Sequence, residues 1–185
     1  MKVKGKHRTI TYTYLYFAAF RSYEAGLNAN QGSFYFNLNS IVMSAFSFEA
    51  FMNHCGRFYY EEQLLEEWDD FKWKKPLQKF DIITELSKVT IDKSIYPYQS
   101  IPELIKLRNA LAHGETETIY SELEIDRYDK IREKLNKPEW EEKCKSEIVK
   151  RFLDDVRSII TIIHKNIFGD DDPFAIMSNG FYGEF

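Results

Sequence analysis

Hydrophobic residues recur every three or four positions along most of the chain, and this spacing is typical of α-helices packed around a core. The clearest row follows Pro138 and ends before Gly169: Ile148, Phe152, Val156, Ile159, Ile160, Ile163 and Ile167. Proline suits the first turn of a helix, and glycine suits the position after the last turn. We therefore predict a final helix from Pro138 to Phe168 that Gly169 closes.

The same spacing predicts earlier helices, separated by short polar or irregular segments. In chain order we expect helices at about 12–27, 38–60, 76–88 and 101–113, a turn at 28–33, an irregular connection at 90–99 and extended or loop backbone at 115–126. The first two helices should pair as an antiparallel hairpin. The whole is predicted to be one all-α domain of residues 1–185, with its core at about 12–168 and a tail at 169–185 that packs irregularly or pairs across a dimer.

The fourth of these helices carries the most informative segment, residues 107–114 (LRNALAHG). Ser100 is placed to cap its start, Pro102 suits the first turn, and Glu103 can complete a capping box. Gly114 is placed to end the helix in a left-handed conformation. An arginine and a histidine on this apolar helix need an explanation, because polar groups are costly to bury without partners.

Winding the helix at about 100° per residue puts Arg108 near the centre of its apolar face, with Asn109 and His113 along one edge. The apolar members of that face are Ile101, Leu104, Ile105, Leu111 and Ala112. Breaking a buried ion pair costs about 3–5 kcal/mol because it leaves one charge unpaired. We therefore expect a carboxylate to meet the guanidinium.

Glu49 is the carboxylate placed to meet Arg108. It lies in the predicted helix at 38–60, in the same row as Leu38, Val42, Ala45, Met52 and Gly56. We predict that Glu49 binds the Arg108 guanidinium through two parallel hydrogen bonds, which hold it in one orientation. Asn53, one helical turn beyond Glu49, is expected to extend this network.

These residues resemble a known family. Arg108 and His113, with four residues between them, fit the R-x4–6-H motif of HEPN-domain proteins, and Asn109 gives its common R-N-x-x-x-H form. Residues 44–53 (SAFSFEAFMN), with Glu49 among apolar positions, look like the second helix of such domains. The resemblance covers the helical body of the chain, although two short segments carry it.

The resemblance implies a HEPN-like up-and-down bundle of four to five helices with a short irregular C-terminal tail, which forms a homodimer. It also implies a metal-independent endoribonuclease without a cofactor, acting as a toxin or phage-defence effector with a possible antitoxin protein as partner. RNA would be cleaved by attack of a 2′-hydroxyl in a cleft between two copies. Arg108 would bind phosphate oxygens, His113 would act as base or acid, and Asn109 would orient the imidazole or contact phosphate. Glu49 and Asn53 would support the arginine.

A second hypothesis stays open beside the ribonuclease. Some toxins of this family continue the motif as H-x-Y, with a tyrosine that a nucleotidyltransferase antitoxin modifies, whereas Gly114 and Glu115 follow His113 in this chain. Other members are catalytically silent and bind nucleotides or serve as partner modules. In such a protein Arg108 is a structural ion-pair partner, and His113 favours the dipole at the end of its helix. The alternative is a silent helical binding or dimerisation module.

The charge balance argues against a general nucleic-acid coat. The net charge is −4 and the pI is near 5.7, whereas such binders present many cations to phosphates. A catalytic cleft can still be locally positive. The densest basic cluster after the N-terminal arm is Lys72, Lys74, Lys75 and Lys79, which we interpret as a solvated helix face that is also able to touch RNA.

The remaining features point to a folded cytoplasmic protein. A hydrophobic fraction of 44% predicts a packed core, and the apolar runs are too short to span a membrane. Cys55 and Cys144 have no CxxC spacing, so we expect structural thiols in a reducing cytosol and no metal motif. His54 and His164 are interpreted as ordinary helical histidines.

Overall fold

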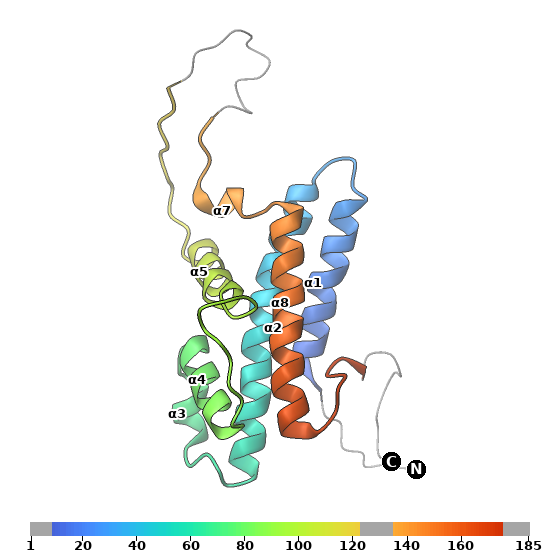
Figure 1. The fold of residues 1–185 in the computed structure, drawn as a ribbon. Helices are drawn as coiled ribbons and strands as arrows, with labels where there is room; N and C mark the ends of the chain where they lie inside the picture. Colours follow the sequence, from blue (N-terminus) through green and yellow to red (C-terminus); the bar gives the residue numbers. More distant parts are fainter. Residues whose placement is uncertain (1–8, 123–134, 176–185) are drawn as a thin grey trace, which may run out of the picture.

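Helices account for every regular element in the part of the chain that the computed structural model describes, residues 9–122 and 135–175. The all-α prediction is confirmed for these residues. Three long helices, α1 (Thr11–Leu27), α2 (Ser33–Glu61) and α8 (Ser146–Phe168), lie side by side, with α1 antiparallel to the other two (Figure 1). The shorter helices are α3 (Trp68–Lys72), α4 (Pro76–Leu86), α5 (Ser100–Ala112) and α7 (Glu139–Glu142).

The central element is α2, which α1, α3, α4, α5 and α8 all contact. Its fully buried side chains include Phe48 and Phe51. The Phe48 ring meets the buried Phe80 ring of α4, with centroids 6.0 Å apart. Burying a side chain of this size stabilises a fold by about 1.5–3 kcal/mol. Ile101 and Leu104 of α5 join the same core, so the helix that carries the motif is held against the centre of the bundle.

Most predicted boundaries are close to the observed ones, but the second helix, the segment after it and the final helix differ. The second helix begins at Ser33, five residues before the predicted start, because Gly32 adopts φ 78° there and lets the turn end early. The added helix α3 is too short to show a hydrophobic row. Its Phe71 is buried with its ring where a side chain on Gly56 of α2 would lie, so glycine permits this close packing.

The prediction of one continuous final helix is wrong, because the chain breaks into α7 and α8 just before Ser146. The buried amide of Asn37 in α2 donates to the Cys144 carbonyl oxygen at 2.9 Å and lies 3.1 Å from the Ser146 hydroxyl. These contacts give the break its own hydrogen bonds, so the helical ladder need not continue through it. As predicted, Pro138 precedes the first turn, and Gly169 ends α8 with φ 74°.

The segment after α8 is irregular and folds back onto the bundle. Phe174 is buried, with its ring centroid 5.9 Å from that of Tyr12 and 4.4 Å from that of Tyr16. The Tyr12 hydroxyl donates to the Pro173 carbonyl oxygen at 2.8 Å. Residues 176–185 of the predicted tail, and 123–126 of the predicted loop, lie outside the described residues. Among the residues that the structure describes, no helix is long and apolar enough to cross a membrane.

Candidate functional site

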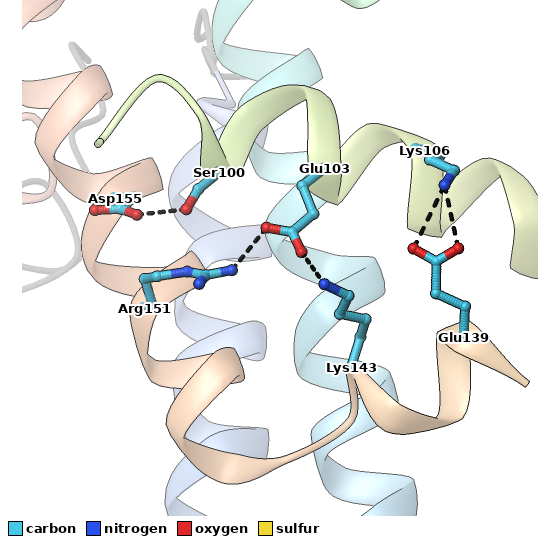
Figure 2. A network of polar contacts seen from close by, with 7 residues as sticks. All are labelled: Ser100, Glu103, Lys106, Glu139, Lys143, Arg151 and Asp155. Carbon is cyan, nitrogen blue, oxygen red and sulfur yellow. Dashed lines mark hydrogen bonds and ion pairs between the residues drawn. The ribbon is translucent and has the colours of Figure 1, made fainter. Parts of the chain in front are cut away.

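Polar contacts to neighbouring segments hold the start of the motif helix α5 (Figure 2). The predicted capping by Ser100 is wrong: the residue lies inside the helix, and its hydroxyl donates to Asp155 of α8. Glu103 closes no capping box either, because its carboxylate accepts hydrogen bonds from Arg151, at 2.7 Å, and from Lys143. Hydrogen bonds between charged groups are stronger than those to a neutral backbone N–H, so these partners prevail.

We call Glu103, Lys143, Arg151 and Asp155 the Glu103 cluster. The side chains of Lys143 and Arg151 are 31% and 34% exposed, so water screens their charges. Burial raises the pKa of Asp155 above its usual range, although the Ser100 hydrogen bond and the Arg151 charge act to lower it. With Asp155 ionised, two carboxylates balance two cations.

At the other half of α5, the predicted pair between Glu49 and Arg108 is present. Arg108 Nη2 donates to Glu49 Oε2 at 2.7 Å, and the arginine side chain is 19% exposed. The bond is single, so the predicted double hydrogen bond is wrong. The guanidinium also lies over the ring of Phe46, 5.7 Å from its centroid, and that ring is itself partly open to solvent. The pair joins α2 to α5 and fixes the position of the guanidinium.

Lys79 of α4 is a third member of this site, and its prediction as a solvated residue is wrong. Its side chain is 2% exposed, and its Nζ lies 3.6 Å from Glu49 Oε1. Burial lowers the pKa of Lys79, while Glu49 acts in the opposite direction. The sequence contained a sign of this, because Lys79 is four residues before the buried Ile83 and thus on the inner face of its helix. We call Glu49, Lys79 and Arg108 the Glu49 cluster.

Asn109 and His113 are exposed at the end of α5. The His113 backbone N–H donates to the Asn109 carbonyl oxygen at 3.0 Å, which closes the last turn. No hydrogen bond or ion pair joins either side chain to another group in the ranges that the structure covers. The imidazole is therefore open to solvent on the same helix as Arg108.

Three details of this helix differ from the prediction. His113 itself leaves the helical conformation, with φ −112° and ψ 20°, so the chain turns out of the helix before Gly114. Among the glycines described, only Gly32 and Gly169 have positive φ, and Gly114 is no left-handed stop. Leu107 is buried while Ala112 is exposed, because α5 packs against α8 and α7 as well as α2.

Asn53 does not extend the ion pair. It lies one turn after Glu49 on α2, but no hydrogen bond connects it to Glu49 or Arg108. Its Oδ1 is buried and accepts no hydrogen bond from any described residue. Asn53 lines a different hollow of the surface, together with Arg57 and Trp68. The structure thus brings together Glu49, Arg108 and the unpredicted Lys79.

The remaining candidate chemistry is sparse. Across 9–122 and 135–175, no three His, Cys, Asp or Glu side chains gather closely enough to hold a metal ion. Cys55 and Cys144 are free and buried, and burial raises the pKa of Cys144 to about 11, which disfavours a reactive thiolate. Comparisons of the chain with protein-family models, curated proteins and solved structures each found no match.

Proposed function

We propose that this protein is a metal-independent endoribonuclease of HEPN type, with Arg108 and His113 as catalytic residues. The observation that carries the proposal is the 2.7 Å ion pair between Glu49 and Arg108. It places a fixed guanidinium on the helix that ends in an exposed imidazole. These are the two kinds of group that phosphodiester cleavage by a neighbouring hydroxyl requires.

In the proposed reaction a base takes the proton of a 2′-hydroxyl, and the 2′-oxygen attacks the adjacent phosphorus. The bond to the 5′-oxygen breaks, and an acid protonates that oxygen as it leaves. The products are a 2′,3′-cyclic phosphate and a 5′-hydroxyl. Arg108 stabilises the charge that builds up on the phosphorane oxygens, and Asn109 orients the imidazole or contacts phosphate.

One imidazole cannot easily serve as base and acid in the same step, so we propose a composite site in a homodimer. A two-fold axis near the end of α5 would bring His113 of a second copy to the same phosphate. The surface there suits such contact, because Phe46 beside Arg108 is 39% exposed and Ala110 and Ala112 are exposed. In this proposal the protein is a cytoplasmic toxin or phage-defence effector, and an antitoxin protein is its natural regulator.

A second candidate function is a catalytically silent binding or dimerisation module. Its supporting observation is that the Glu49 cluster links α2, α4 and α5, which is sufficient reason to keep Arg108 without any substrate. In that case the exposed His113 has no catalytic task.

Cleavage of RNA in EDTA separates the two functions. Wild type and His113→Ala would be incubated with mixed structured and unstructured RNA, and the fragment ends would be analysed. The ribonuclease proposal predicts 2′,3′-cyclic ends with wild type alone. The two proteins should have equal helix content by circular dichroism. Equal cleavage by both proteins would remove His113 from the mechanism, and no cleavage by either would favour the silent module.

A further inference from the structure

The Glu49 cluster contains more positive than negative charge. Glu49 divides its carboxylate between two cations, with Oε2 bound to Arg108 at 2.7 Å and Oε1 at 3.6 Å from Lys79. Among the described residues, no other carboxylate forms an ion pair with either cation. With all three groups ionised, the cluster carries one uncompensated positive charge in a partly buried position.

The Glu103 cluster has the same arrangement of one glutamate with a lysine and an arginine, yet it is balanced. Asp155 lies close enough to Arg151 to feel its charge and supplies the second carboxylate. The charges that act on Lys79, by contrast, are those of Glu49 and Arg108. The surplus charge is therefore a property of the Glu49 cluster and not of every such triad in this fold.

We propose that the Glu49 cluster is an anion site for a phosphate group, and that Lys79 is the positioning residue that leaves the charge of Arg108 free to bind it. This inference rests on the proposed function, because it assigns the phosphodiester of the substrate to that site. Lys79 is buried, so it does not touch the ligand. From its buried position Lys79 neutralises the charge of Glu49. The partly exposed guanidinium of Arg108 then presents a full positive charge to the ligand.

The hydrogen-bonding capacity of Arg108 agrees with this role. A guanidinium has five N–H donors, and the recorded bond to Glu49 engages Nη2 alone. Its Nε is buried and has no acceptor among the described residues, so the donors left for a ligand are those of the two terminal nitrogens. Two terminal N–H groups in one plane match two oxygens of a phosphate.

The test uses inorganic pyrophosphate as the probe and the arginine side-chain resonances of the ¹⁵N-labelled protein as the readout, assigned with Arg108→Lys. In wild type, pyrophosphate should shift the Arg108 resonances. Lys79→Met removes the buried charge at similar volume and should raise the dissociation constant about tenfold, as expected for loss of one charge at short range in a partly buried site. Lys79→Arg keeps the charge and should restore the affinity.

The matched control is Lys143→Met, the same change in the balanced Glu103 cluster, which should leave pyrophosphate binding unchanged. Unaltered affinity in a folded Lys79→Met protein would overturn the role of Lys79. Absence of any Arg108 shift in wild type would overturn the anion site, and this outcome does not depend on the stability of the Lys79 variants. The binding experiment contains no RNA, so it is independent of cleavage. Pyrophosphate binding by a protein without ribonuclease activity would therefore preserve the anion site and refute the proposed function instead.

Discussion

The two halves of α5 are anchored by polar clusters of similar composition in different surroundings. In each cluster one glutamate meets one lysine and one arginine: Glu103 with Lys143 and Arg151, and Glu49 with Lys79 and Arg108. The first connects α5 to α8 and to the residue after α7, at a site that water reaches. The second connects α5 to α2 and α4, with its lysine almost wholly buried.

The partners of a carboxylate do not by themselves decide the effect of a cluster of charged residues. Asp155 balances the Glu103 cluster, and solvent screens its cations, so its main effect is to orient α5. The Glu49 cluster has no second carboxylate among the described residues, and its lysine is almost wholly buried, so its surplus charge attracts an anion.

The largest difference should appear in catalysis. We expect His113→Ala to lower RNA cleavage by about 10³-fold, since a positioned proton carrier contributes about 10²–10⁴-fold. Lys143→Ala, in the Glu103 cluster, should change the rate by less than about twofold, because it alters a partly exposed ion pair that water screens. Rates on a fluorescent RNA under single-turnover conditions measure both, and similar losses in the two variants would contradict the contrast.

The next largest difference should appear in the stability lost when each glutamate is replaced. Glu49→Ala strands Lys79 and Arg108, and we expect it to lower the free energy of unfolding by about 3 kcal/mol. Glu103→Ala leaves cations that water can solvate and should cost about 1 kcal/mol. Urea denaturation of both variants at neutral pH gives the values, and an equal cost would mean that burial of Lys79 does not distinguish the clusters.

Arginine should be replaceable in one cluster and not in the other. Arg108→Lys keeps the charge but loses the planar fork, so we expect cleavage to fall by about tenfold. Arg151→Lys should leave cleavage unchanged, because Arg151 only anchors α5. The same fluorescent RNA assay serves here, and full activity of Arg108→Lys would remove the need for bidentate phosphate binding.

The smallest expected effect concerns the balancing carboxylate. Burial raises the pKa of Asp155, so the folded state disfavours its ionised form relative to the unfolded chain. Asp155→Asn should therefore be slightly more stable than wild type at pH 7. The difference should shrink as the pH falls through the raised pKa toward the usual aspartate range, where wild type becomes protonated. Urea denaturation between pH 7 and 3.5 would show this, and a difference that grows on acidification would reverse the assigned sign.

Much of the fold and part of the site could be predicted from local pattern. The first helix was predicted to within one residue, because its apolar row and the polar turn after it lie close together in the chain. The pairing of Glu49 with Arg108 was predicted because each is a charge in an apolar row, and a charge in such a place requires a partner.

Two of the errors come from competition by residues distant in sequence. Ser100 has the composition of a cap, but Asp155 takes its hydroxyl. The final helix looked continuous, but Asn37 hydrogen-bonds at the break. Lys79 is a different case, because the inner row that it shares with the buried Ile83 is a local pattern of the sequence.

By itself, the sequence determined where most of the helices lie, most of the faces they bury and which two charges must meet, since helical periodicity and the cost of an unpaired buried charge are local or pairwise properties. Only the tertiary structure decided that Lys79 joins Glu49 and Arg108, and that Asp155 balances the Glu103 cluster. These outcomes depend on how three helices cross, which sets the burial and the summed charge at one point in space. The net charge of a site is therefore fixed by packing, even when each of its members is visible in the sequence.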